Sequence, residues 1–217
     1  MNEHPPSPLA TLGAQDISAL TRSTLSHYQS QAKSFREGTK DHDVSQNVDA
    51  LLRNLPGSHE QRILDFGCGP GRDLATFVKH GHKTIGLDGA AAFVEMARDA
   101  TDCEVWHQDF LSLDLPPKRF EGVFANAVLF HVPTQELPRV LGDLRRTLVD
   151  GGVLFCSNPR GPDVEGPQGL RYGAYLTLDT WGKYVSSAGF KLIEHYYRPQ
   201  GRPRNEQPWL ATVWRAI

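Results

Sequence analysis

LDFGCGPGR, residues 64–72, joins a short apolar run to a helical pattern, and this stretch decides the fold. Its glycines permit tight turning and a close approach of the backbone to a ligand. The helix that follows offers unpaired N–H groups and a partial positive charge, which suit an anionic or polar ligand. A dinucleotide fingerprint needs a third glycine at position 72, where this chain has Arg72. The spacing Gly-x-Gly-x-Gly, with Asp65 two residues before Gly67, therefore argues against a dinucleotide.

The alternation of apolar runs and helical stripes around this loop predicts an α/β protein. Five short runs alternate with helical patterns over about 130 residues, which is typical of a parallel sheet with helices on both faces. Two closing runs lack a helix between them, so we expect an antiparallel edge hairpin. The predicted fold is thus a Rossmann-like, seven-stranded, mostly parallel sheet, with strands at 62–66, 83–87, 103–107, 121–127, 153–156, 191–197 and 209–214.

Composition limits the classes of protein to which the chain can belong. The 217 residues are 39% hydrophobic and 22% charged, which describes a globular chain of one domain. The formal charge of −2 argues against a general nucleic-acid binder. No apolar run reaches the roughly 20 residues of a membrane span, and the first residues lack a secretory signal. Three cysteines without metal-type spacing indicate free thiols, so we expect a cytoplasmic protein with no metal site.

The region before residue 57 predicts a separate helical layer. Residues 1–15 are rich in proline and small residues and are predicted to be a disordered leader. Tyr28, Ala32 and Phe35 then fall on one helical face, and a second helix is predicted to start at Asp43, with Gln46 completing its capping box. Residues 16–217 are expected to form one domain, in which 16–56 are a helical lid and 57–217 the catalytic core.

Two acidic residues follow the second and third predicted strands. Asp88 ends the second strand, where a carboxylate can accept hydrogen bonds from both hydroxyls of a ribose. Asp109 follows the third strand and is next to Phe110. A simpler interpretation is that both acids only cap loops. Their combination with the glycine loop favours the binding of a nucleoside.

The glycine loop resembles motif I of class I S-adenosylmethionine (SAM) methyltransferases. The resemblance implies SAM as cofactor, an acid near the adenine amino group at Asp109, and an apolar neighbour against the ring at Phe110. It also implies that residues 126–133 line the floor beside the transferred methyl group. The expected cofactor-binding residues are Tyr28, Asp65, Gly67, Cys68, Gly69, Asp88, Gly89, Asp109, Phe110 and Asn126.

The segment after the fifth strand is predicted to be a substrate-binding loop. Loops at the carboxyl ends of parallel strands carry binding functions in this architecture, and arginines with tyrosines suit a carboxylate and a flat ring. Asn126 and His131 are the candidate catalytic residues, although a lone histidine is more often structural. The expected substrate-binding residues are Asn47, Phe130, His131, Asn158, Arg160, Arg171, Tyr172 and Tyr175.

Longer strings resemble one methyltransferase family more closely. They include HDVSQN at 42–47, FHVPTQELPRVL at 130–141, RYGAY at 171–175 and QPWLATVWR at 207–215. Together they are similar to the C-terminal methyltransferase domain of ovothiol synthase, over about residues 27–215. The resemblance implies methylation of an imidazole nitrogen of 5-thiohistidine to give ovothiol A, by a stand-alone enzyme. One departure is Pro167, where that family has an aromatic residue.

The resemblance also implies partners and leaves alternatives open. A small molecule, 5-thiohistidine, is the expected substrate, and a sulfoxide synthase and a lyase are the expected pathway partners. No nucleic acid or membrane is expected to bind. One alternative is methylation of another small metabolite, and another is a catalytically silent SAM-binding partner subunit.

Overall fold

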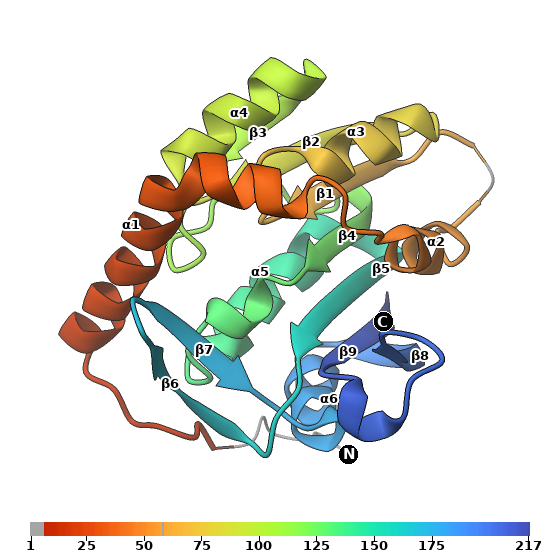
Figure 1. The fold of residues 1–217 in the computed structure, drawn as a ribbon. Coiled ribbons are helices and arrows are strands. Elements are labelled where there is room, and N and C mark those ends of the chain that lie inside the picture. The colour runs from red at the N-terminus through yellow and green to blue at the C-terminus, as the bar shows by residue number, and fades with distance from the viewer. Residues whose placement is uncertain (1–6, 58) are drawn as a thin grey trace.

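A seven-stranded sheet forms the centre of the computed structural model, which describes residues 7–57 and 59–217 (Figure 1). The strand order is β3-β2-β1-β4-β5-β9-β8. The strands are β1 (Arg62–Phe66), β2 (Lys83–Asp88), β3 (Glu104–His107), β4 (Phe120–Asn126), β5 (Leu148–Pro159), β8 (Phe190–Arg198) and β9 (Trp209–Ala216). Strands β1 to β5 are parallel, whereas β9 runs antiparallel between β5 and β8. The predicted fold, including the antiparallel hairpin at the edge, is confirmed.

Helices cover both faces of this sheet. They are α1 (Ala14–Thr39), α2 (Ser45–Leu52), α3 (Arg72–Lys79), α4 (Ala91–Thr101), α5 (Leu137–Thr147) and α6 (Leu178–Ser187), with short 3-10 helices η1 (Leu129–His131) and η2 (Arg204–Glu206). Alternate strand residues pack against opposite layers: Val123 lies in the cluster with α5 and α6, and Phe124 in the cluster with α2 and α3. Helix α5 buries Val140, Leu141 and Leu144, because residues three and four apart share one helical face.

Helix α1 lies outside these two layers. Figure 1 shows it extending from the neighbourhood of β6 and β7 to α4, and it contacts both β7 and α4. Tyr28 and Phe35 pack with Phe93 of α4, at ring-centroid distances of 5.9 and 5.2 Å. The predicted helical layer before residue 57 therefore consists of two different parts: α1 bridges α4 and β7, whereas α2 packs directly on the sheet.

Two predictions about the N-terminal region need correction. The second helix begins at Ser45, with Val44 as its N-cap, so Asp43 and Gln46 do not form the predicted capping box. Asp43 Oδ1 instead accepts a hydrogen bond from the Ser45 backbone N–H at 2.9 Å, in the turn before the helix.

The predicted leader also differs where the structure describes it, since residues 1–6 lie outside the described residues. The backbone N–H groups of Leu9, Ala10 and Leu12 donate to Thr134, Glu165 and Gln135 side chains. Helix α1 then begins at Ala14, two residues before the predicted lid boundary. These hydrogen bonds hold the end of the leader against the rest of the chain.

The segment after β5 contains a second sheet where the sequence predicts a loop. Strands β6 (Val164–Gln168) and β7 (Arg171–Tyr175) pair antiparallel, with Gly169 in the turn at a φ of 63°. Glycine and proline within β6 hide the strand pattern from sequence analysis. In the part of the chain that the structure describes, no helix has the length and apolar character needed to cross a membrane.

Candidate functional site

A cavity of about 760 Å³ opens at the carboxyl ends of the parallel strands. The strand order reverses between β1 and β4, and open α/β sheets bind ligands at such a switch point. The cavity is lined by α1, by the α1–α2 connection and by the segments that follow β1, β2, β3 and β4. The expected site residues that line it are Tyr28, Asn47, Gly67, Cys68, Gly69, Asp88, Gly89, Asp109, Phe110, Asn126, Phe130, His131 and Arg171.

The glycine loop after β1 is shaped by two positive φ angles. Gly67 has φ 76° and Gly69 has φ 53°, a region that favours glycine. A Cβ at Gly67 would lie 2.3 Å from Cγ2 of Val128, so the backbone at Gly67 passes too close to the Val128 side chain for any residue but glycine. The Gly69 N–H donates to Oδ2 of Asp88 at 2.9 Å, which ties the loop to the end of β2.

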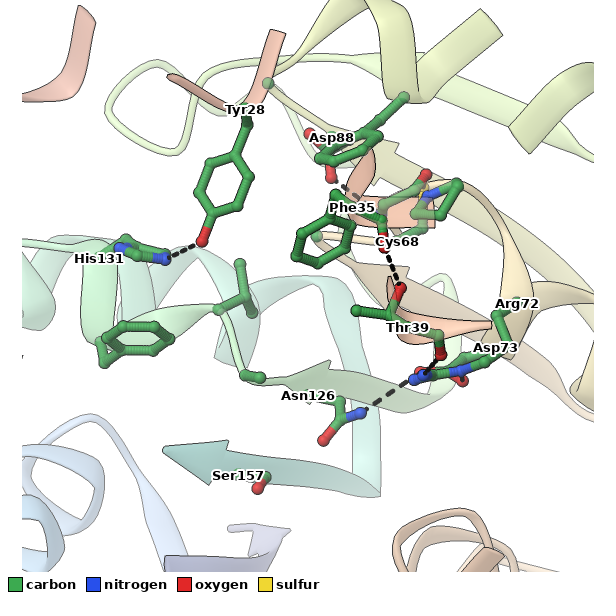
Figure 2. A pocket seen from close by; sticks show the side chains of 18 of the residues that line it. Tyr28, Phe35, Thr39, Cys68, Arg72, Asp73, Asp88, Asn126, His131 and Ser157 are labelled. Carbon is green, nitrogen blue, oxygen red and sulfur yellow. Dashed lines mark hydrogen bonds and ion pairs between the residues drawn. The ribbon is translucent and has the colours of Figure 1, made fainter. Parts of the chain in front are cut away.

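Asp88 is a buried carboxyl group at the edge of the cavity (Figure 2). Its two oxygens accept from the Gly69 and Ala90 N–H groups, both at 2.9 Å. Burial raises the pKa of Asp88 to about 6, although the backbone donors favour the ionised form. The side chain therefore caps its own turn and also faces the ligand space, which reconciles the two interpretations of this acid.

The segment after β3 adds an acid and an aromatic ring to the same cavity. Oδ1 of Asp109 accepts from the Leu111 N–H at 2.9 Å, and Phe110 stacks on Phe66 with ring centroids 4.4 Å apart. The carboxyl of Asp88, the carboxyl of Asp109 beside the Phe110 ring, and the glycine loop all line this one cavity. Together these groups fit SAM, which combines a nucleoside with an amino acid.

Asp65 does not line the cavity, contrary to its predicted role in cofactor binding. It is 2% exposed within β1, and its Oδ2 lacks a hydrogen-bond partner among the described residues. Burial, and secondarily the nearby Asp73, raise the pKa of Asp65 well above its usual range. Its position therefore argues against direct contact with a ligand.

His131 is held at both ring nitrogens. Nδ1 lies 2.6 Å from the Tyr172 carbonyl oxygen, which can only accept, so Nδ1 carries the proton. Nε2 therefore accepts from the Tyr28 hydroxyl at 2.7 Å (Figure 2). Burial lowers the pKa of His131 to about 4, which keeps the ring neutral near pH 7. This arrangement fixes Tyr28 and does not leave His131 as a free base.

The far end of the cavity is lined by amides, aromatic rings and arginines. Asn47 Nδ2 donates to Asn126 Oδ1 at 3.0 Å, and Phe130 meets Trp209 edge to face at 6.4 Å. Ala127 follows Asn126 with φ 60°, a rare conformation for a residue with a side chain. Arg171 and Arg198 also line this space.

Four expected substrate-binding residues lie outside the cavity lining: Asn158, Arg160, Tyr172 and Tyr175. The Arg160 guanidinium donates to the carbonyl oxygens of Gln207 and Arg204, which directs its charge into the β8–β9 connection. The Tyr172 hydroxyl donates to Glu165, and Asn158 lines a separate small cavity. These side chains support the wall of the site and do not face the ligand space.

Other cavity residues were missed by the sequence analysis. Phe35 lies on the same helical face as Tyr28, seven residues later, so its position was readable from the pattern. Arg198 is the last residue of β8 and Trp209 the first of β9, and no local sequence signal places them at the end of β4. Within the described residues, no group of three or more His, Cys, Asp or Glu side chains is arranged to hold a metal ion.

Comparison with known proteins agrees with this geometry. Residues 63–152 match a family model described as a methyltransferase domain. A trans-aconitate 2-methyltransferase of Azoarcus sp. (strain BH72) is 33% identical over 115 residues, which are 52% of this chain and 45% of that protein. Another, from Rhodopseudomonas palustris (strain BisA53), is 33% identical over 142 residues, 64% of this chain and 53% of that protein. The chain thus spans about half the length of the curated relatives it matches.

Solved structures share the fold across nearly the whole chain. One is the 1,6-didemethyltoxoflavin-N1-methyltransferase of Burkholderia thailandensis, crystallised with 1,6-didemethyltoxoflavin and S-adenosylhomocysteine. It superposes with a TM-score of 0.75 at 21% identity, covering 97% of this chain and 94% of that chain. Residues 63–152 thus match a methyltransferase domain, and the chain as a whole shares the fold of that solved methyltransferase.

Proposed function

We propose that this chain transfers a methyl group from SAM to an imidazole nitrogen of 5-thiohistidine, giving ovothiol A. The observation that carries the proposal is the composition of the cavity beyond the end of β4. There Asn126, Phe130, Trp209 and two arginines surround a space suited to a small, flat, charged acceptor. The sequence strings shared with the ovothiol synthase methyltransferase domain support the particular acceptor.

The glycine loop and its neighbours hold the cofactor in this proposal. Asp88 accepts hydrogen bonds from the ribose hydroxyls, and Asp109 and Phe110 flank the adenine. SAM supplies an electrophilic methyl group on a positively charged sulfur. Methyl transfer needs no metal, so the chain contributes mainly alignment and exclusion of water, worth about 7–11 kcal/mol at best.

Arg171 and Arg198 are the proposed partners of the acceptor's carboxylate, in place of Arg160. Arg171 lies 3.4 Å from the Tyr28 hydroxyl, whereas Arg198 donates to the Asp43 carbonyl at 2.6 Å. Arg72 also lines the cavity, but Asp73 and the Thr39 carbonyl already occupy its guanidinium. The lone pair of one ring nitrogen of the acceptor then forms the new C–N bond while the methyl–sulfur bond breaks to leave S-adenosylhomocysteine, and the proton on the other ring nitrogen is afterwards lost to solvent.

The deciding experiment is a product assay with purified protein and SAM. We expect turnover of 5-thiohistidine and little turnover of histidine, because donors arranged for a sulfur stay unpaired when histidine binds. Mass spectrometry and NMR identify the product, which should carry the methyl group on the ring nitrogen nearer the side-chain branch. Equal turnover of histidine, or methylation on sulfur, contradicts the proposed acceptor. A synthase and a lyase that supply 5-thiohistidine are the proposed pathway partners.

A melting experiment tests the cofactor separately. S-adenosylhomocysteine should stabilise the fold by about 2.7 kcal/mol at one hundred times its Kd, and NAD should leave it unchanged. Stabilisation by NAD alone contradicts the proposed cofactor.

A second candidate is O-methylation of a small polycarboxylate. Relatives described as trans-aconitate 2-methyltransferases favour it, and the same two arginines suit such an acceptor. Including trans-aconitate in the product assay separates the two candidates. A third candidate is a catalytically silent SAM-binding subunit. Binding of S-adenosylhomocysteine without turnover of any of these acceptors favours it.

A further inference from the structure

A chain of polar side chains runs from the edge of the sheet to the glycine loop. The Tyr196 hydroxyl of β8 donates to Asn47 Oδ1 of α2 at 2.9 Å, and Asn47 Nδ2 donates to Asn126 Oδ1 at 3.0 Å. Asn126 Nδ2 in turn donates to Oδ2 of Asp73, at the start of α3, at 3.3 Å. We call these four residues the amide relay. Asn47, Asn126 and Asp73 line the cavity, whereas Tyr196 does not.

The direction of the amide relay is fixed by the carboxylate at one end. Both oxygens of Asp73 accept from the Arg72 guanidinium, at 2.7 and 3.0 Å, so Asp73 offers Asn126 only an acceptor. At the other end, Asn47 Oδ1 and the Gln46 carbonyl oxygen lie 2.9 and 3.2 Å from the Tyr196 hydroxyl, and the hydroxyl donates its single proton toward these two acceptors. Burial raises the pKa of Tyr196, which keeps the hydroxyl protonated as a donor. An asparagine amide can otherwise be reversed with little change in shape.

Reversal of either amide would bring like groups together. If Asn126 were reversed, its carbonyl oxygen would face the Asp73 carboxylate, and its NH₂ group would face that of Asn47. Figure 2 shows the observed arrangement, in which the Asn126 nitrogen is turned toward Asp73 and its oxygen away from it. Asn47 is only 1% exposed, so water does not compensate for a mismatched amide there.

We propose that Tyr196 and Asp73 are positioning residues that fix Asn126 as a hydrogen-bond acceptor for the methyl acceptor. A carbonyl oxygen has two lone pairs, and Asn47 uses one of those on Asn126. The other accepts the N–H of an azole ring, which leaves the second ring nitrogen with its lone pair available for methylation. The amide relay thereby determines which ring nitrogen reacts. This assignment to a ring nitrogen rests on the proposed function.

Tyr196→Phe tests the amide relay without altering a cavity residue. Tyr197→Phe is the matched control, because it removes a hydroxyl from the next position of the same strand. In protein labelled with ¹⁵N-asparagine and loaded with S-adenosylhomocysteine, Asn47→Asp and Asn126→Asp assign the two side-chain amide signals. We expect Tyr196→Phe to shift both signals and Tyr197→Phe to shift neither. Asp73→Asn alters the opposite end of the amide relay and should also shift both amide signals.

Unchanged Asn126 amide signals in Tyr196→Phe and Asp73→Asn would overturn the proposal. This measurement needs no acceptor, so it decides the amide relay even if 5-thiohistidine is not a substrate. Should Tyr196→Phe not fold, Asp73→Asn carries the same measurement.

The catalytic consequence has its own measurement. With 5-thiohistidine, we expect Tyr196→Phe to lower kcat about fivefold and to increase the share of product methylated on the other ring nitrogen, with the KM for SAM unchanged. An unchanged kcat and product ratio, despite shifted amide signals, contradicts the positioning role. Absence of turnover in the unmodified protein contradicts the proposed acceptor and, with it, the assignment to a ring nitrogen.

Discussion

The two halves of the cavity are built in different ways. The half proposed to bind SAM, the cofactor half, comes from residues 67–110, and its groups lie at or after the ends of three neighbouring strands. The half proposed to bind the methyl acceptor, the acceptor half, combines Asn47, Asn126, Arg171, Arg198 and Trp209 from five separate elements. The first half is therefore determined by short loops and backbone conformation, and the second by long-range packing. Substitutions in one half should consequently affect one ligand and spare the other.

The largest effect is expected in the cofactor half, from Asp88→Ala. This change removes two proposed hydrogen bonds to the ribose and leaves the Gly69 N–H without its carboxylate partner. We expect the Kd for SAM to rise tenfold to a hundredfold, since hydrogen bonds to a charged group contribute about 1.5–3 kcal/mol. Calorimetry measures the change, and Asp99→Asn, on the exposed face of α4, is the control. Unchanged affinity in a folded Asp88→Ala variant contradicts the role of this residue.

The next effect tests how far the acceptor half depends on tertiary contacts. The carboxylate of Glu165 accepts from the Ala10 N–H at 2.7 Å, from the Thr134 N–H and hydroxyl at 2.8 and 2.7 Å, and from the Tyr172 hydroxyl. Glu165→Gln places an NH₂ group against some of these donors and should lower the free energy of unfolding by about 1–3 kcal/mol.

Chemical denaturation measures this loss, with Glu95→Gln on exposed α4 as control. Because Tyr172 also holds His131, we expect the KM for the acceptor to rise while the KM for SAM stays constant. Equal changes in both KM values would show that the two halves are not separable.

The affinity of the cofactor half for its ligand should depend on pH. The pKa of Asp88 is raised to about 6, and ribose hydroxyls bind its ionised form better. Protonation therefore competes with binding: affinity is full above pH 7 and falls as the pH drops through 6, by about tenfold at pH 5. Titration calorimetry with S-adenosylhomocysteine between pH 5 and 8 measures this, and Asp88→Asn should abolish the dependence. A flat profile in the unmodified protein argues against ribose binding by this carboxylate.

The smallest effect concerns the arginines of the acceptor half. Arg171→Ala and Arg198→Ala should each raise the acceptor KM about fivefold, because a partly exposed ion pair contributes only about 1 kcal/mol. Arg160→Ala should leave that KM unchanged, since its guanidinium is engaged by the β8–β9 connection. Steady-state kinetics compares the three variants. A larger effect for Arg160→Ala would reverse the assignment.

Local signals predicted most of the cofactor half. The glycines, Asp88 and Asp109 all line the cavity because strand ends in a parallel sheet meet at one edge. Asp65 was wrongly expected to face the ligand: the motif gives its spacing, but the packing of β1 buries its side chain. Asp43 similarly caps a turn and not the predicted helix, because the chain starts its helix two residues later.

The acceptor half was predicted less well. Asn47, Asn126, Phe130, His131 and Arg171 were placed correctly at the cavity. Tyr172 was not, because it alternates with Arg171 along β7 and so faces the supporting wall. Arg160 was not, because its guanidinium binds carbonyl oxygens of the β8–β9 connection, and Asn158 and Tyr175 also lie outside the lining. No sequence pattern specifies which side of the β6–β7 hairpin faces the ligand.

The sequence alone determined the succession of strands and helices along the chain, the glycine loop, and the acids at the ends of β2 and β3. These depend on periodicity and on conformations that only neighbouring residues influence. The tertiary structure alone decided that Tyr28 meets His131, that Glu165 joins three segments, and that Tyr196 reaches Asn126 through Asn47. Such contacts join residues about 30 to 155 positions apart, and their geometry is set by the packing of whole elements.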